Sequence, residues 1–335
     1  MIRRVCSVLV LGLLVSATTR AEIYALPPEG YDVIGAVSTI TARHEDTLVD
    51  IARRHGLGYE DIVRANPGVN VWVPGEGTEV VLPTQFVLPP GPREGVVLNL
   101  AEYRLYYFPA PKAGEPAYVK TYPISIGRMD WETPLGNTAV ISKVRNPSWY
   151  VPQSVLQEHE EMGDPLPRIV PPGPDNPLGK FAMRLGLPGY LIHGTNRPAG
   201  VGMRVTHGCI RMFPEDIEYL FGKIDIDTPV RIINEPVKIG WVGDELVMEV
   251  HPVLEVATPG PQDKETEEGD TDPLDAVVEA KNPLTYVTER FIAATEVRAG
   301  QLDWYLAEKM VERSDGIPAP VGEGIKNAAA SAAFE

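Results

Sequence analysis

Cysteine is almost absent from this chain, since Cys6 and Cys209 are the two cysteines among its 335 residues. Cys6 belongs to an N-terminal apolar segment that we expect to be removed, which leaves Cys209 alone. A single cysteine cannot form an internal disulfide bond, and a lone thiol in an oxidising compartment is prone to mispairing. Cys209 is therefore either a small buried apolar residue or a residue that takes part in chemistry.

Hydrophobic runs long enough to cross a membrane are also lacking. Residues 5–15 form an uncharged apolar stretch that follows Arg3 and Arg4 and precedes small residues up to Ala21. This pattern is typical of a secretory signal peptide over residues 1–21, so we expect export to the periplasm. The stretch is too short for a span, and proline, glycine or charge interrupts the later candidates. No membrane span is expected after cleavage.

Positive charge is scarce. The chain has 30 lysine and arginine residues against 46 aspartate and glutamate residues, which gives a formal net charge of -16. Removal of residues 1–21 would take away three arginines and no acidic residue, so the mature chain would carry -19. Such a surface repels the phosphate backbone of nucleic acids, which are therefore not expected partners.

Proline and glycine, in contrast, are plentiful, with 33 and 31 residues. Proline is at about twice its usual share and interrupts helices too often for a helical bundle or a long coiled coil. The length of the chain is about twice that of a typical domain, which predicts two or more modules. We expect short strands separated by many turns.

Residues 36–84 form a candidate small module. Alternating side chains over residues 37–42 predict a strand, and Asp46 is placed to cap a helix that ends at Gly56. A second short helix follows, and residues 78–82 predict a closing strand. The expected order is therefore strand, helix, helix, strand.

The loops of this module resemble those of a LysM domain, which binds the N-acetylglucosamine-containing glycan of peptidoglycan or chitin. The resemblance lies in Asp46-Thr47-Leu48 and Asn66-Pro67 and in the closing strand. It departs at Glu45, where the family usually has glycine. The resemblance implies that Asp46, Thr47, Asn66 and Pro67 contribute to glycan binding.

Residues 93–236 predict a mainly β catalytic domain that is sandwich-like with mixed sheets. A helix is expected from Pro214 to Gly222, because proline and acidic residues open it and glycine ends it. The strand candidates are residues 96–101, 104–108, 122–126, 138–143, 181–184, 190–193 and 230–233.

The flanking segments complete the expected organisation. Residues 89–92 predict a proline-rich linker that makes the small module separable. We expect residues 237–257 to extend the strands of the catalytic domain, and residues 258–282 to form an acidic linker. Residues 283–315 predict a helical C-terminal subdomain that packs on the catalytic domain. Residues 316–335 have the composition of a disordered tail.

Two histidines lie close to Cys209 in the sequence, namely His193 and His207. A cysteine attacks as the thiolate, and a neighbouring imidazole can take its proton and later return one to a leaving amine. Gly194 and Gly208 leave room for a substrate backbone, and peptide N–H groups near Gly208 could bind an oxyanion. The pattern indicates nucleophilic catalysis.

These residues stand in a motif that resembles the active site of the YkuD-like L,D-transpeptidases. With the small module in front and a helical extension behind, the chain resembles the periplasmic, LysM-bearing subgroup, which includes the type that attaches Braun lipoprotein. The motif consists of His193-Gly194-Thr195 and Thr206-His207-Gly208-Cys209-Ile210-Arg211.

The resemblance implies a reaction on the tetrapeptide stems of peptidoglycan. Cys209 is the implied nucleophile and His193 the general base, with the carbonyl of Gly194 orienting the imidazole. The thiolate attacks the carbonyl of the L-centre of meso-diaminopimelate, D-Ala leaves, and an amine resolves the thioester. The favoured acceptor is the lysine of an outer-membrane lipoprotein, and a 3→3 cross-link is second.

Three further residues receive roles from the same resemblance. His207 lines the donor pocket, Gly208 belongs to the oxyanion site, and Arg211 steadies the donor or the loop of Cys209. No cofactor and no metal are expected. The expected partners are the glycan and stem peptides of peptidoglycan.

Three alternatives remain open from the residues. His193, His207 and Cys209 could bind zinc, since three nitrogen or sulfur ligands and a water form a hydrolytic site. A cysteine hydrolase, an L,D-carboxypeptidase of cell-wall peptides, would share the acyl-enzyme. A third possibility is a non-catalytic adaptor that binds peptidoglycan.

The remaining histidines and several aromatic residues carry weaker signals. Four histidines lie among charged or loop residues and are expected to be solvated: His44, His55, His159 and His251. Three aromatic residues could either line a donor groove or pack in the interior: Trp131, Trp149 and Tyr150.

Overall fold

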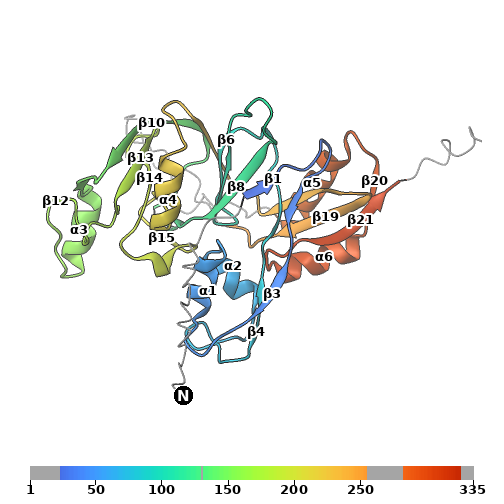
Figure 1. Cartoon of the computed structure of the whole chain (residues 1–335), viewed down its shortest axis with the longest axis horizontal. Coiled ribbons are helices and arrows are strands. Elements are labelled where there is room, and N and C mark those ends of the chain that lie inside the picture. The colour runs from blue at the N-terminus through green and yellow to red at the C-terminus, as the bar shows by residue number, and fades with distance from the viewer. Residues whose placement is uncertain (1–22, 130, 255–281, 326–335) are drawn as a thin grey trace, which may run out of the picture.

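The computed structural model describes residues 23–129, 131–254 and 282–325, and Figure 1 shows three units. The N-terminal module lies at the bottom in blue, a large sheet with its helix fills the left and centre, and the C-terminal unit lies at the right in orange and red. The buried apolar residues form three clusters that follow these units.

The catalytic region is built on one nine-stranded sheet of mixed direction. Most neighbouring strands are antiparallel, but two pairs, β17 with β6 and β14 with β16, are parallel. The mainly β architecture with mixed pairing is thus confirmed, and one continuous curled sheet provides it. In spatial order the strands are β1 (Ile23–Ala25), β8 (Tyr118–Pro123), β7 (Arg104–Phe108), β6 (Gly95–Asn99), β17 (Pro229–Ile233), β10 (Gly136–Arg145), β13 (Phe181–Leu185), β14 (Leu191–His193) and β16 (Ile210–Arg211).

The expected helix after Cys209 is present as α4 (Pro214–Phe221), which packs on β13. Proline stands in its first turn together with Glu215 and Asp216, where negative charge favours the start of a helix. Its apolar face, which includes Ile217 and Leu220, joins the main core beneath the sheet. The helix therefore follows directly from the local sequence.

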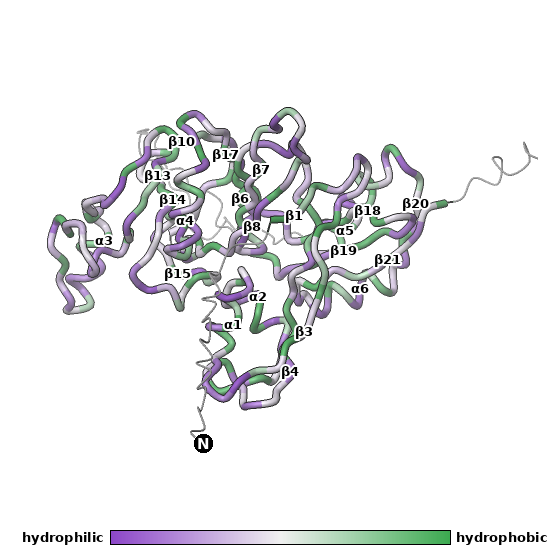
Figure 2. The backbone as a smooth tube through the Cα atoms, in the orientation of Figure 1, coloured by the Kyte–Doolittle hydropathy of each residue, from purple (hydrophilic) through white to green (hydrophobic). Residues whose placement is uncertain are grey.

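The central strands are buried on both faces. In β7, Leu105 and Tyr107 belong to the main catalytic core, whereas Tyr106 and Phe108 belong to the cluster of the N-terminal module. Successive side chains of a strand point to opposite faces, so the two cores lie on opposite sides of the same strand. Figure 2 shows the hydrophobic colour along β6, β7 and β8 at this junction.

The N-terminal module has the expected order of strand, helix, helix and strand. The two strands of this order pair antiparallel with each other. The strand before the first of them and the strand after the last of them form a second antiparallel pair. The order predicted for the four inner elements is confirmed. The elements are β2 (Val33–Gly35), β3 (Ser38–Thr41), α1 (Leu48–Arg54), α2 (Tyr59–Ala65), β4 (Glu79–Leu82) and β5 (Gln85–Val87).

The expectation that this module is separable is wrong, because it shares a core with the catalytic sheet. Polar contacts reinforce the junction: Arg53 of α1 forms a bidentate ion pair with Glu215 of α4, at 2.7 and 2.8 Å. A Cβ at Gly58 would lie 2.7 Å from the Cα of Gly202, so only glycine permits this backbone approach. The proline-rich segment connects two units that are already packed together.

The C-terminal unit is a four-stranded antiparallel sheet with two helices. α5 packs on β18 and α6 packs on β19. Of residues 237–257, expected to extend the catalytic sheet, the described residues 237–254 do not, because their two strands begin a separate sheet. The helical prediction for residues 283–315 holds, with a short strand between the helices, but the helices pack mainly on the sheet of their own unit, so the expected packing on the catalytic domain is wrong. The elements are β18 (Val237–Val242), β19 (Glu245–Val250), α5 (Pro283–Thr295), β20 (Gly300–Leu302), α6 (Trp304–Arg313) and β21 (Ala319–Gly324).

The expected disordered tail is corrected for residues 316–325, because β21 lies between β19 and β20. Its sequence is rich in glycine and proline, which conceals the strand. The glycine has a structural reason: a Cβ at Gly322 would lie 2.1 Å from the carbonyl oxygen of Gln301. Val321 is fully buried in the core of this unit.

Some expectations fall outside the described residues, namely the signal peptide, the rest of the tail and almost all of the acidic linker. Asn282, the last residue of that linker, caps α5 through its side chain. Among residues 23–129, 131–254 and 282–325, no helix has the length and apolar character needed to cross a membrane.

Candidate active site

A parallel strand pair brings Cys209 next to the strand that carries His193. His193 is the last residue of β14, and β16 begins immediately after Cys209. In the register of the pair, Ile192 lies opposite Ile210 and His193 opposite Arg211. Segments that are separated in the sequence therefore meet at one edge of the catalytic sheet.

The imidazole of His193 is held in one tautomer. Its Nδ1 lies 2.6 Å from the carbonyl oxygen of Gly194. A carbonyl can only accept, so Nδ1 donates and the neutral ring keeps its lone pair on Nε2. Burial, with a smaller effect of the positive charge of Arg211, lowers the pKa of His193 to about 4. His193 is therefore a neutral base at physiological pH.

Cys209 is half-buried and is a free thiol. Its Sγ lies 3.6 Å from the carbonyl oxygen of Gly189. Burial raises the pKa of the thiol, although the backbone of Leu191 and the charge of Arg211 oppose that shift. A thiol with a raised pKa needs a base to become nucleophilic. The neutral imidazole of His193, at the end of the paired strand β14, has the protonation state for that task.

Hydrogen bonds fix the loop that precedes Cys209. Thr206 donates from Oγ1 to the carbonyl oxygen of Cys209 at 2.6 Å, and Thr133 donates to the carbonyl oxygen of Gly208 at 2.8 Å. Gly208 has a φ of 90°, and a Cβ there would lie 2.9 Å from the ring of Tyr190. Glycine is required at this position both by the conformation and by the space.

Arg211 lies on β16, two residues after Cys209. Its backbone pairs with Ser125, at 2.8 and 3.0 Å, which holds the strand in place. The Nε atom of its guanidinium is buried and has no hydrogen-bond partner among the described residues. A buried cationic donor without a partner, two residues after Cys209, can bind an anionic or carbonyl oxygen of a substrate.

His207 faces an acidic residue instead of the thiol. Its Nε2 lies 2.7 Å from a carboxylate oxygen of Glu158, and its ring meets Trp131 edge to face with centroids 5.0 Å apart. The other oxygen of Glu158 accepts from Arg128 at 2.7 Å. This contact does not fit the zinc site that His193, His207 and Cys209 could form, because Nε2 of His207 is directed at the carboxylate of Glu158 on another element.

Glu158 lies on α3 (Gln153–Glu161), a helix inserted between β11 (Trp149–Tyr150) and β12 (Ile169–Val170). Sequence reasoning did not predict this helix and missed both Glu158 and Arg128. Arg128 follows β9 (Ile126–Gly127), which pairs with β15 (Arg204–Thr206) just before His207. The sequence contains no signal that distinguishes Glu158 from the neighbouring glutamates.

The three aromatic candidates occupy different positions. Trp131 contacts His207 at the site, as described above. Trp149 and Tyr150 form β11 at the base of the α3 insertion, where Tyr150 is exposed and Trp149 is half-buried. Trp131 is therefore the one whose contact with the site is direct.

The residues assigned to glycan binding divide into internal and surface positions. Asp46 is buried and accepts from Arg54 and from the backbone of Arg43. Asn66 is buried and forms two hydrogen bonds with the backbone of Val81. Both side chains thus hold the module together. The remaining two lie nearer the surface: Thr47 caps α1 and is half-buried, and Pro67 is exposed.

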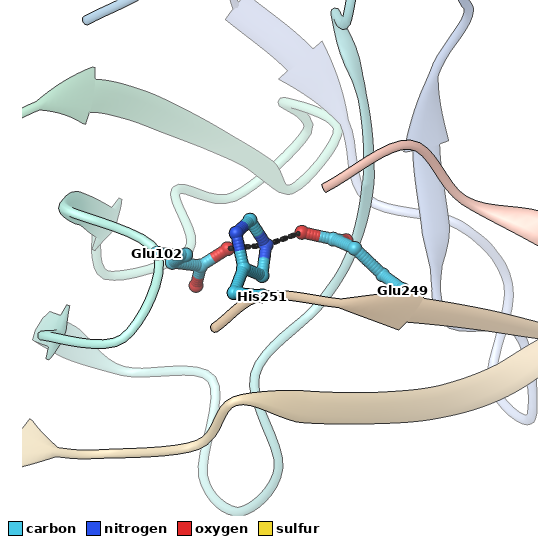
Figure 3. A group of neighbouring side chains, drawn as sticks. All are labelled: Glu102, Glu249 and His251. Carbon is cyan, nitrogen blue, oxygen red and sulfur yellow. Dashed lines mark hydrogen bonds and ion pairs between the residues drawn. The ribbon is translucent and has the colours of Figure 1, made fainter. Parts of the chain in front are cut away.

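A second polar cluster lies at the start of the C-terminal unit. Figure 3 shows Glu102, Glu249 and His251, whose ligand atoms lie within 4.8 Å of one another. The ammonium of Lys238 lies 2.5 Å from Glu102 and 2.9 Å from Glu249, in the place that a metal cation would take. The expectation that His251 is solvated is wrong, because it is buried here beside Glu249. We assign this cluster to the fold.

The catalytic region matches known proteins on its own. A family model of the L,D-transpeptidase catalytic domain, YkuD, matches residues 93–232, which include His193 and Cys209. A solved structure of L,D-transpeptidase 3 from Mycobacterium tuberculosis is 22% identical, with a TM-score of 0.30 over 46% of this chain and 66% of that chain.

Longer matches then give the family. The chain is 38% identical to a probable L,D-transpeptidase ErfK/SrfK of Salmonella typhimurium, over 93% of this chain and 95% of the relative. It is 40% identical to the probable L,D-transpeptidase YcfS of Escherichia coli, over 72% of this chain and 77% of the relative. The chain belongs to the L,D-transpeptidase family and is a transpeptidase enzyme.

Proposed function

We propose that this transpeptidase acts on the tetrapeptide stems of peptidoglycan in the periplasm through a thioester on Cys209. The observation that carries the proposal is the β14 and β16 pair, which sets Cys209, the residue before β16, beside the strand that ends in His193, whose imidazole is neutral with Nε2 unprotonated. The family resemblance of the surrounding motif supports the choice of substrate.

The proposed acylation begins when Nε2 of His193 takes the proton of the Cys209 thiol. The thiolate attacks the carbonyl carbon of the L-centre of meso-diaminopimelate, and an oxyanion forms on the carbonyl oxygen. The bond to D-Ala then breaks, and His193 returns its proton to the departing amine. The product is a thioester between Cys209 and the stem, with free D-Ala.

In the second half, an amine attacks the thioester carbonyl. His193 takes a proton from the attacking nitrogen, the C–S bond breaks, and the sulfur recovers a proton. Peptide N–H groups at Gly208 and Cys209 are the proposed donors to the oxyanion. Arg211, whose Nε is buried without a partner among the described residues, would bind a donor oxygen.

We assign glycan recognition to the N-terminal module, in keeping with its resemblance to LysM domains. Trp72 and Val73 are exposed in the loop between α2 and β4. This loop lies against the start of α1, because the Leu48 N–H donates to the Val71 carbonyl at 2.8 Å. An exposed apolar loop beside the cap residue Thr47 offers a surface for sugar rings.

The proposed acceptor is the lysine of an outer-membrane lipoprotein, with a second stem peptide as the other candidate. The chain is strongly acidic, at -16 before and -19 after removal of residues 1–21. A negative surface attracts a flexible basic terminus more than a net-anionic stem peptide. Screening at physiological salt confines this preference to about 8 Å, the mouth of the site.

The test is covalent capture of Cys209. A carbapenem has a strained carbonyl that can acylate the thiol, so intact-protein mass spectra should show one adduct on the wild type and none on Cys209→Ala. Cys209→Ala removes little volume, and unchanged circular dichroism is the control for folding. An adduct on the alanine variant, or activity that is lost in EDTA, would overturn the thioester mechanism.

Product analysis identifies what resolves the thioester. The wild type is incubated with a tetrapeptide stem and with a lysine-terminated peptide, and the products are separated by mass. We expect a stem joined to lysine with loss of D-Ala. Free tripeptide alone would identify a hydrolase, and stems joined only to diaminopimelate would identify a cross-linking enzyme.

A further inference from the structure

The side chains of Arg128 and His207 lie beside the loop of Cys209 and share one carboxylate. Arg128 and His207 each contact a different oxygen of Glu158, both at 2.7 Å. The backbone N–H of Arg128 donates to the carbonyl of Thr206, so Arg128 is anchored to the residue that precedes His207. His207 is two residues before Cys209. The carboxylate of Glu158 is thus held against the loop that carries Cys209.

The three side chains remain accessible. Their exposed fractions are 33% for Arg128, 28% for His207 and 25% for Glu158, so water and solutes reach the group. Ion pairs at such exposure contribute little to stability, so a competing carboxylate can replace Glu158. The helix that supplies Glu158 is also weakly anchored, because Val155 is its buried residue.

The hydrogen bonds of Arg128 and of His207 lower the pKa of Glu158, so Glu158 is an anion at physiological pH. A stem peptide that ends in D-Ala presents carboxylates near its scissile bond, one on D-Ala and one on the side chain of diaminopimelate. Each has the charge and the geometry of the Glu158 carboxylate. The Glu158 carboxylate, which bridges a guanidinium and an imidazole, therefore takes the place that a carboxylate of the donor would occupy.

We propose that Arg128 and His207 form a subsite for a carboxylate of the donor stem, and that Glu158 occupies this subsite in the substrate-free enzyme. Donor binding then exchanges one carboxylate for another and releases α3 from the nucleophile loop. The inference rests on the proposed stem-peptide function. It adds that Glu158 is a competitor of the donor, whereas a structural role would make Glu158 a support for donor binding.

The experiment measures binding in the Cys209→Ala background, where no chemistry occurs. The probe is the tetrapeptide L-Ala-γ-D-Glu-meso-diaminopimelate-D-Ala, titrated by calorimetry. Glu158→Gln keeps the size of the side chain and removes its charge, and should tighten binding about fivefold. Glu160→Gln is the matched control, since Glu160 lies on the same helix and is exposed, and it should leave the affinity unchanged.

Two amidated probes distinguish the source of the carboxylate. One has D-Ala as its amide, and the other has the side-chain carboxyl of diaminopimelate as its amide. The probe that lacks the bound carboxylate should lose its sensitivity to both Glu158→Gln and Arg128→Gln, while the other keeps it. That difference assigns the ligand to one of the two positions.

Two results would overturn the proposal. Weaker binding of every probe by Glu158→Gln would show that Glu158 supports the site. Equal effects of the substitution on free and amidated probes would show that no donor carboxylate enters the subsite. Carbapenem adducts on the enzyme with intact Cys209 report the proposed function separately, so failure of the subsite and failure of the thioester are distinguishable.

Discussion

His193 and Cys209 are both neutral in the resting enzyme. Burial lowers the pKa of His193 and raises that of Cys209, so the pair does not start as a thiolate and an imidazolium. The hydrogen bond to Gly194 leaves Nε2 as the acceptor. In the proposed mechanism, proton transfer therefore accompanies attack on the substrate, with the imidazole as the general base.

The acid limit of acylation follows from this state. A base whose pKa is lowered to about 4 stays unprotonated as the pH falls through 6.5, so its function persists and is lost only near pH 4. We expect the rate of carbapenem acylation to fall on the acid side with an apparent pKa near 4. Stopped-flow measurement between pH 3.5 and 8 checks it, over the range where the fold is intact. An acid limb centred near 6.5 would contradict the neutral pair.

Lys238 stabilises the buried cluster of Glu102, Glu249 and His251 by its positive charge. Burial raises the pKa of both Glu102 and Glu249, and the Lys238 ammonium opposes this by pairing with both. Lys238→Met should destabilise the protein by about 3 to 5 kcal/mol, because two carboxylates remain buried without their cation. Chemical denaturation measures the loss.

The loss should depend on pH with a definite sign. Carboxyl groups with raised pKa values bind protons more readily in the folded state, so folded stability falls as the pH rises. Lys238→Met should therefore be less harmful at pH 5 than at pH 8. The variant that also carries Glu102→Gln and Glu249→Gln serves as the control and should recover stability. A loss that is equal at both pH values would contradict the charge argument.

At the scale of elements, local patterns predicted those segments whose structure depends on their own residues. The four inner elements of the N-terminal module and α4 were predicted, because caps, apolar periodicity and stops all lie within the segment. β21 was missed, because its glycines serve contacts with β20 that the sequence does not reveal. α3 was missed too, and with it Glu158. The role of Glu158 depends on its contact with a residue far along the chain.

The same limit applies to the site. The motif identified His193 and Cys209 because the two stand in a recognisable pattern of neighbours. His251 was misjudged, because its charged neighbours in the sequence indicate solvent, whereas β19 and the turn after β6 enclose it in a buried ion network. Burial depends on which elements pack together, and that is decided beyond the local sequence.

The loop between α2 and β4 is the element that tests glycan binding. Trp72→Ala should weaken the binding of intact sacculi several-fold, because the loop loses an exposed ring that can contact sugars. Trp304→Ala is the matched control, since it removes an exposed tryptophan from α6 in the C-terminal unit. A sedimentation assay with purified sacculi compares them. Equal binding by both variants would assign the module a purely structural role.

At the scale of the whole molecule, the units are joined through shared cores and ion pairs. The N-terminal module covers one face of the catalytic strands, and the Val87 N–H donates to Glu249 of the C-terminal unit at 2.6 Å. The catalytic sheet is thus buried between its own core and the module. Removal of either neighbour would expose apolar strand surface.

β21 provides a test at this scale. A chain that ends at Asp315 loses the strand between β19 and β20 together with buried Val321, and its C-terminal unit should lose at least about 3 kcal/mol of stability. Fluorescence of Trp241 and Trp304 during denaturation follows this unit. A chain that ends at Ile325 keeps β21 and is the control. Identical midpoints for the two chains would refute the contribution of the strand.

The position of β21 also determines the order in which the protein can fold. β19 pairs with a strand from the far end of the described chain, and β6 pairs with β17 across most of the catalytic domain. Contacts between residues so distant in sequence form slowly, because long loops must close first. The C-terminal sheet cannot be completed until the chain has been synthesised through β21, which ends at Gly324. A product that terminates between β19 and β21 therefore leaves β19 with an open edge, which distinguishes it from the full chain for proteases.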